Sequence, residues 1–248
     1  MSHIILIHGA WAGRWVWDNL LPGLDTAGHV AHAVDLPGNG QDGRAPEDIT
    51  LATYVSHVQE LLETLPGKVF LVSHSGGGVT ATQVAEAMPE KVAGVVYIAG
   101  MMLPSGVPFG EITGALREQH PDISGIVPHL RWNSARSAST VPAEAAQNIF
   151  LHDVPAPQAQ AAAARLTAQP EAARAAPPVW TPERYGSLPR LYVEATRDRS
   201  VLIAAQRRMQ SLTPGAHVVT LDCGHVPQVA APDALLDALL SFFSATVE

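Results

Sequence analysis

Short apolar runs alternate along the chain with segments in which apolar residues recur every three or four positions. A run that is apolar throughout predicts a strand buried on both faces, and the periodic segments predict amphipathic helices. The runs that we interpret as strands are Ile4–Ile7, Val30–Val34, Val69–Val72, Val92–Ala99, Leu191–Ala195 and His217–Leu221. The segments that we interpret as helices are Trp15–Ala27, Leu51–Leu65, Gly76–Met88, Leu202–Leu212 and a final helix that begins at Pro232. This alternation predicts an α/β fold in which helices flank a mostly parallel sheet.

Residues 101–185 interrupt the alternation. This stretch is rich in Pro and Ala and lacks strand-like runs. A disordered linker is the alternative interpretation, but the stretch contains aromatic residues that could anchor it to a core, namely Phe109, Trp132, Phe150 and Trp180. We therefore predict that residues 101–185 form a helical cap, inserted into an α/β core that is made of residues 1–100 and 186–248.

Composition excludes several classes of protein. The 248 residues suffice for one α/β domain around a single core, and the 47% hydrophobic content is typical of a globular protein. A net charge of −8 argues against a general nucleic-acid binder, which needs a basic face. No apolar run has the length of a membrane span and the N-terminus has no signal-peptide pattern, so we expect a cytoplasmic protein without membrane contacts. The lone Cys223 excludes an intrachain disulfide and a cysteine-based metal site.

Ser75 lies in the sequence VSHSGGG, residues 72–78, between an expected strand and an expected helix. A serine hydroxyl becomes an effective nucleophile when a base reaches it and a tight turn raises it above the sheet. Such a turn requires small residues two positions before and after the serine, and here these are Ser73 and Gly77. We predict that Ser75 is a nucleophile and that His74, which precedes it, is a structural side chain that points away.

His225 and Asp198 are the predicted base and acid. His225 follows the last expected strand, and Asp198 follows the strand before it. In a parallel sheet these loops open at the same edge as the turn at Ser75. Glu194 is a poorer acid because it lies within a strand, and Asp222 is too close to His225 in sequence to reach around its ring. Cysteine 223 could in principle be a nucleophile, but no tight turn of small residues surrounds it.

The first expected strand ends in His8-Gly9-Ala10, and a loop that begins with glycine can aim a backbone N–H at a substrate carbonyl. We predict that the backbone N–H groups of Ala10 and Gly76 form an oxyanion hole.

The sequence GNGQDG, residues 38–43, matches the G-x-G-x-x-G pattern of dinucleotide sites. The residues that follow, Arg44-Ala45-Pro46, do not begin a helix, and no acidic residue ends a second strand about 20 positions further on. We interpret this stretch as a flexible turn. Zinc-protease, EF-hand and P-loop motifs do not occur, so we expect no cofactor and no metal ion.

With these residues placed, the chain resembles the α/β-hydrolase superfamily over nearly its whole length. The order Ser75, Asp198, His225 is that of the α/β hydrolases. Within the superfamily the chain is similar to the branch that contains plant methyl esterases, hydroxynitrile lyases and related bacterial esterases. The segments that carry the resemblance are ILIHGAW at 5–11, WVW at 15–17, DLPG at 35–38, the turn at Ser75, and residues 192–198 and 224–232. The resemblance implies a cap over the site and a sheet without the two extra N-terminal strands of larger members.

Two positions discriminate within that branch. The lyases carry a threonine after the first-strand histidine and a lysine, which helps to handle cyanide, directly after the catalytic histidine. This chain has Gly9 and Val226 there. The resemblance therefore favours a serine esterase that cleaves a small, largely apolar carboxylic ester through an acyl-enzyme. Lactone, amide or C–C bond hydrolysis and a hydroxynitrile lyase on the same triad stay open, as does a ligand receptor without turnover.

The predicted partner is a small-molecule ester, and the sequence leaves a homodimer open. Because caps in this family cover the substrate, candidate pocket residues are Trp11, Met101, Met102, Trp132 and Trp180. Packing within the cap is the alternative role for these side chains.

Overall fold

The computed structural model describes residues 1–39, 42 and 44–247 of the chain. Within this part, six strands form a sheet in the order β2-β1-β3-β4-β8-β9, and every neighbouring pair is parallel. The strands are β1 (His3–Ile7), β2 (Val30–Val34), β3 (Val69–His74), β4 (Val92–Ile98), β8 (Arg190–Ala195) and β9 (His217–Leu221). The predicted parallel sheet of an α/β fold is confirmed.

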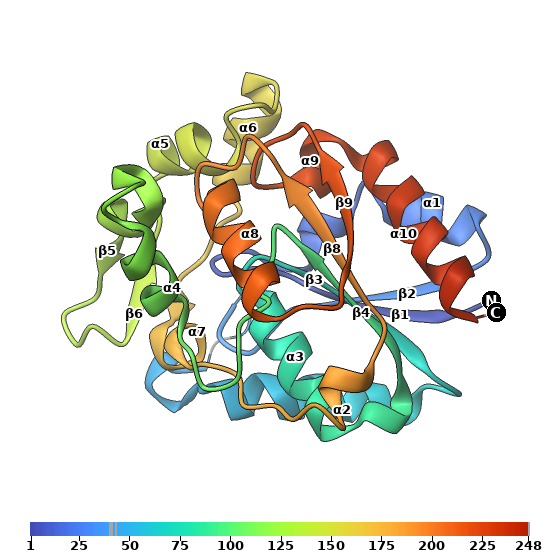
Figure 1. Ribbon diagram of the computed structural model, residues 1–248. Helices are drawn as coiled ribbons and strands as arrows, with labels where there is room; N and C mark the ends of the chain where they lie inside the picture. The colour runs from blue at the N-terminus through green and yellow to red at the C-terminus, as the bar shows by residue number, and fades with distance from the viewer. Residues whose placement is uncertain (40–41, 43, 248) are drawn as a thin grey trace.

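Helices cover both faces of this sheet (Figure 1). They are α1 (Leu21–Thr26), α2 (Leu51–Thr64), α3 (Gly77–Ala87), α8 (Ile203–Leu212), α9 (Pro227–Ala230) and α10 (Pro232–Val247). Short 3-10 helices lie at η1 (Arg14–Trp17), η2 (Pro46–Asp48), η3 (Pro89–Lys91) and η7 (Tyr185–Ser187). The sheet is therefore the middle layer of three, as expected for apolar parallel strands.

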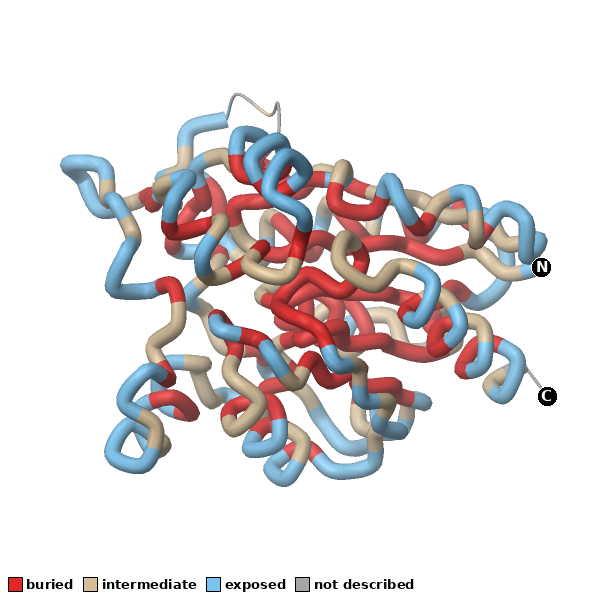
Figure 2. Tube along the Cα trace, turned by 90° about the horizontal axis from the view of Figure 1, so that it is seen from above, coloured by how far each residue is buried: buried red, intermediate tan, exposed pale blue. Residues whose placement is uncertain are grey.

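Alternate residues of each strand supply the two cores. In β1, Ile5 and Ile7 pack with α2 and α3, whereas Ile4 and Leu6 pack with α1 and α10. Figure 2 shows the buried residues concentrated along the sheet, with exposed residues on the outer helices. All six residues of β3 are buried, so the strand that leads to Ser75 is rigidly held.

The start of α2 follows from local chemistry. Thr50 precedes the helix in an extended conformation, and its side chain accepts a hydrogen bond from the Thr53 N–H. The Thr53 hydroxyl accepts one from the Thr50 N–H in return, which satisfies two otherwise unpaired donors. Apolar residues on one face of α2 then pack against the sheet.

The segment 101–185, which we continue to call the cap, lies at the edge where the parallel strands end (Figure 1). Its helices are α4 (Phe109–Leu116), η4 (Pro121–Ser124), η5 (Val127–His129), α5 (Ala143–Ala145), the π-helix η6 (Ala146–Phe150), α6 (Ala156–Ala163) and α7 (Glu171–Ala175). In one respect the cap differs from the expectation, because it also contains an antiparallel sheet in the order β5-β6-β7. These strands are β5 (Arg131–Trp132), β6 (Ala138–Thr140) and β7 (Gln169–Pro170), each too short to show a period of two. Among the helices described, none combines the length and apolarity needed to cross a membrane.

Candidate active site

Ser75 occupies a sharp turn between β3 and α3. Its φ of +49° lies in the left-handed region, which is costly for a residue with a side chain. Hydrogen bonds on both sides hold this conformation: the Ser75 N–H donates to Ile98 O at 3.1 Å, and the Ser75 carbonyl accepts from the N–H of Met101 at 2.9 Å. Backbone strain of this kind concentrates at functional sites, and a nucleophile turn requires it.

The residues around Ser75 have no room for larger side chains. A Cβ on Gly77 would lie 2.5 Å from the His8 carbonyl oxygen, and one on Gly78 would lie 2.9 Å from Met101 O. Ser73 is fully buried, and its hydroxyl donates to Val96 O at 2.7 Å. The need for small residues at this turn therefore comes from close backbone packing.

Asp198 and His225 meet at the carboxyl ends of β8 and β9. The His225 Nδ1 lies 2.7 Å from Asp198 Oδ2, and both side chains are buried. The other carboxylate oxygen accepts from the N–H groups of Ser200 at 2.7 Å and Val201 at 2.9 Å. Because a carboxylate accepts, the proton of the neutral imidazole lies on Nδ1, which leaves Nε2 free to act as a base.

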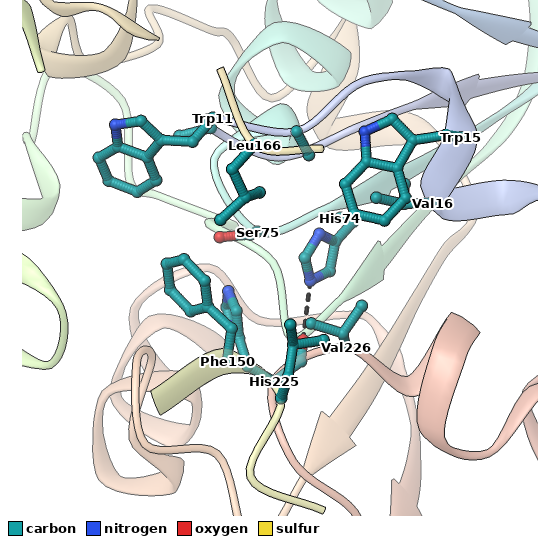
Figure 3. Close-up of a pocket in the computed structure, with 12 residues that line it drawn as sticks. Trp11, Trp15, Val16, His74, Ser75, Phe150, Leu166, His225 and Val226 are labelled. Carbon is teal, nitrogen blue, oxygen red and sulfur yellow. Dashed lines mark hydrogen bonds between the residues drawn. The ribbon is translucent and has the colours of Figure 1, made fainter. Parts of the chain in front are cut away.

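Ser75 and His225 line the same cavity, which Figure 3 shows in close-up. No direct hydrogen bond joins the Ser75 hydroxyl to the His225 ring in the described structure. Such contacts are often long in an enzyme without substrate and shorten when substrate binds. The three residues of the predicted triad are thus at one place in the fold, although they come from three different loops.

His74 lines the same cavity as Ser75, whereas the sequence predicts a side chain that points away from Ser75. Its Nε2 donates to the backbone carbonyl of His225 at 2.8 Å, and the two rings are 4.8 Å apart (Figure 3). Burial lowers the pKa of His74 well below its usual value, and the neighbouring His225 lowers it further. His74 is therefore a neutral donor that supports the main chain of the predicted base.

The two predicted oxyanion donors are neighbours. A Cβ on Gly76 would lie 3.8 Å from the Ala10 nitrogen. In the described part of the chain, neither the Ala10 N–H nor the Gly76 N–H donates to another protein group. Gly76 also precedes the first residue of α3, where the helix dipole favours negative charge. Two free donors beside Ser75 fit a developing oxyanion.

Apart from Ser75 and the two histidines, the cavity is lined by apolar side chains. The volume that the centre of a water molecule can occupy in it is about 30 Å³, within about 440 Å³ of empty space that includes open solvent. The remaining lining residues are Ala10, Trp11, Ala12, Trp15, Val16, Phe150, Leu151, Leu166 and Val226. Three of them, Phe150, Leu151 and Leu166, belong to the cap, so the cap forms one wall of the site. The sequence marked Phe150 only as an anchor of the cap.

Of the predicted pocket residues, Trp11 lines this cavity. Met101 lines a separate hollow, together with Phe109 and Arg174. Met102, Trp132 and Trp180 are not among the residues described around the Ser75 cavity.

Packing accounts for these last three side chains. Met102 is fully buried in the core beside α2 and α3. Trp132 lies under the guanidinium of Arg136, at 4.7 Å, and Trp180 donates its ring N–H to Leu103 O at 3.0 Å. Met102 and Trp180 thus pack with the core of the sheet, and Trp132 contacts a residue of the cap.

The structure disfavours Cys223 as a nucleophile. Burial raises the pKa of the Cys223 thiol to about 12, so a reactive thiolate is disfavoured there. No group of three or more His, Cys, Asp or Glu residues is arranged to hold a metal ion within the described ranges. Of the glycine-rich stretch at 38–43, Gly40, Gln41 and Gly43 lie outside the described residues.

Comparisons with known proteins show which family the chain is similar to. A family model for the alpha/beta hydrolase family matches residues 4–238. The pyrethroid hydrolase of Sphingobium wenxiniae is 29% identical over an alignment of 256 positions, which covers 100% of this chain and 90% of that protein. Methylesterase 9 of Arabidopsis thaliana is 26% identical over an alignment of 249 positions, which covers 97% of this chain and 97% of that protein. A crystal structure of a pyrethroid hydrolase, PytH, superposes with a TM-score of 0.86 at 27% identity and covers 100% of this chain and 99% of that one.

Proposed function

Since the chain belongs to the alpha/beta hydrolase family and is an esterase-type enzyme, we propose that it cleaves a small, largely apolar carboxylic ester through an acyl-enzyme on Ser75. One observation carries this proposal. His225, which is hydrogen-bonded to the buried Asp198, lines the same cavity as Ser75, beside two peptide N–H groups that lack acceptors in the described structure.

In the acylation step, His225 Nε2 takes the proton of the Ser75 hydroxyl while Ser75 Oγ attacks the ester carbonyl. The Ala10 and Gly76 N–H groups bind the oxyanion that forms. Each such donor contributes roughly 3–4 kcal/mol of transition-state stabilisation in enzymes of this kind. The protonated imidazole then donates its proton to the leaving alcohol, while Asp198 stabilises the imidazolium.

In the second step, the same imidazole takes a proton from water, which attacks the acyl-enzyme. The tetrahedral intermediate collapses, the proton returns to Ser75 Oγ, and the carboxylic acid is released. Asp198 holds the Nδ1 proton throughout, because its other oxygen is bound by two backbone N–H groups and cannot turn away.

The lining of the cavity supports an apolar substrate. None of the described side chains that line it carries a fixed charge, and three aromatic rings, those of Trp11, Trp15 and Phe150, line the same cavity as Ser75 and His225. A charged acyl or alcohol group would lose its hydration there without gaining a partner. The relatives named for pyrethroid hydrolysis and methylesterase activity also favour an ester substrate.

The positions that separate esterases from lyases support hydrolysis. A Cβ on Gly9 would lie 2.9 Å from the Ser75 Cβ, so the threonine of the lyases would collide with the nucleophile here. Val226 lines the cavity where the lyases carry lysine. Among the described residues that line the cavity, none offers an ammonium group to a cyanide ion.

The test compares wild type with Ser75→Ala. We expect wild type to hydrolyse p-nitrophenyl acetate and butyrate and to be labelled once by a fluorophosphonate, and we expect Ser75→Ala to do neither. Wild type that is neither labelled nor active on any short aryl ester would overturn the proposal and favour a receptor. Cleavage of mandelonitrile that is lost in Ser75→Ala, without ester turnover, would favour the lyase instead.

A further inference from the structure

Two adjacent cap residues, His152 and Asp153, contact both loops that carry the predicted acid and base. His152 Nε2 donates to the carbonyl oxygen of Arg197 at 2.9 Å. Asp153 Oδ2 accepts from the backbone N–H of Gly224 at 2.5 Å. Arg197 directly precedes the acid and Gly224 directly precedes the base. His152 and Asp153 lie in the segment just before α6, and Arg197 and Gly224 follow β8 and β9.

The Asp153 carboxylate is held in a confined place. Its side chain is only 7% exposed, and the Arg197 guanidinium approaches it at 3.7 Å. A Cβ on Gly224 would lie 2.5 Å from Asp153 Oδ1, so only glycine allows the carboxylate to come this close. A carboxylate that is withdrawn from water needs donors, and charge-assisted hydrogen bonds to backbone N–H groups are short and strong.

Asp153 and His74 hold the two sides of the His225 main chain. His74 Nε2 donates to the carbonyl oxygen of His225, and Asp153 accepts from the N–H of the preceding residue. The imidazole must stay aligned with Asp198 on one side and with Ser75 on the other. Fixing the backbone at both ends limits how far the ring can shift.

We propose that Asp153 is a positioning residue, which orients His225 through the Gly224 N–H so that the imidazole stays aligned between Asp198 and Ser75. The proposal rests on the esterase function proposed above. It assigns the cap a second task, since the cap both forms a wall of the cavity and holds the loop of the base.

Glu86 offers a matched control. This residue of α3 is also a sheltered carboxylate, with a side chain 13% exposed. It accepts from the N–H groups of Thr181 at 3.0 Å and Tyr185 at 3.1 Å, at the junction between the cap and the core. None of these three residues lines the Ser75 cavity. If Asp153 only stabilised the fold, Asp153→Ala and Glu86→Ala would have similar effects on melting temperature, on ester hydrolysis and on the rate of labelling.

The experiment compares Asp153→Ala, Asp153→Asn and Glu86→Ala by ester hydrolysis, by the rate of fluorophosphonate labelling and by melting temperature. We expect Asp153→Ala to lower kcat and the labelling rate by about 10–100-fold, with KM changed less than about 3-fold. Asp153→Asn keeps an oxygen acceptor for Gly224, so we expect a loss of less than about 5-fold. Glu86→Ala should lower the melting temperature but change kcat less than about 2-fold, because it is remote from the imidazole.

Proton NMR can measure the alignment of His225 with Asp198 in an enzyme that is not turning over substrate. The Nδ1 proton of His225 should give a downfield resonance that disappears in His225→Ala. We expect this resonance to shift or broaden in Asp153→Ala and to stay unchanged in Glu86→Ala. If wild type neither hydrolyses esters nor is labelled, the esterase proposal fails while this resonance still decides the role of Asp153.

Three results would overturn the positioning role. The first is an Asp153→Ala protein with the wild-type labelling rate and an unchanged resonance. The second is an equal loss of labelling in Glu86→Ala. The third, which stays decisive if Asp153→Ala does not fold, is an Asp153→Asn protein whose labelling rate falls by more than about 100-fold, since its oxygen still accepts from Gly224.

Discussion

Replacing Asp198 by asparagine should reverse the tautomer of His225. One carboxylate oxygen accepts from two backbone N–H groups, those of Ser200 and Val201, at 2.7 and 2.9 Å. An asparagine that turned its NH₂ group towards them would leave these donors unpaired, at a cost of about 1–3 kcal/mol each. The amide oxygen will therefore occupy that place, and the NH₂ group will face His225 Nδ1.

With a donor facing it, Nδ1 of the His225 ring must accept, so the imidazole proton moves to Nε2 and the ring can no longer take the Ser75 proton. We expect kcat to fall about 10³–10⁴-fold. That loss corresponds to about 4–5.5 kcal/mol of transition-state stabilisation. The melting temperature should fall by only about 2–4 °C, because the two backbone hydrogen bonds persist and only the 3.3 Å bond from Gln206 Nε2 to the replaced oxygen is lost.

The assay is the hydrolysis of p-nitrophenyl acetate, with labelling by a fluorophosphonate as a second readout. Asp222→Asn is the control, since Asp222 is also close to His225 in sequence, but its side chain is 84% exposed and pairs with Arg197. We expect less than about a 2-fold change there, as is usual for an exposed ion pair. An Asp198→Asn enzyme within tenfold of wild type would refute the tautomer argument.

Three further variants test the packing around the site. Gly77→Ala places a Cβ 2.5 Å from the His8 carbonyl oxygen, so we expect it to lose about 1–3 kcal/mol of stability, measured by urea unfolding. Phe150→Ala removes a ring that lies 5.2 Å from the His225 ring, and it should raise KM for aryl esters about 10-fold while kcat changes less. Burial lowers the pKa of His74, so only the unfolded chain takes up a proton there as the pH falls through about 6.5. Stability should therefore drop between pH 7.5 and pH 5.5, and thermal melts should show a smaller drop in His74→Gln. Wild-type stability in Gly77→Ala, an unchanged KM in Phe150→Ala or an equal pH effect in His74→Gln would contradict these arguments.

Local pattern in the sequence determined the layers of this protein. Apolar runs predicted the strands of the parallel sheet, and apolar residues at every third or fourth position predicted the helices. These patterns are local, because each element needs apolar residues on the faces that it buries. The small residues around Ser75 predicted a tight turn before any tertiary contact was considered. The placement of Asp198 and His225 followed from the rule that parallel strands end at one edge.

Only the tertiary structure decided how these parts meet. Cap strands of two or three residues carry no readable period, so the small sheet of the cap was not predicted. The contact between Asp153 and Gly224 joins residues 71 positions apart, and no local pattern encodes it. Trp132 and Phe150 both read as cap anchors, yet Phe150 is the one that lines the cavity. The reason is physical: a strand or helix depends on neighbours along the chain, whereas a cavity wall depends on which distant surfaces pack together.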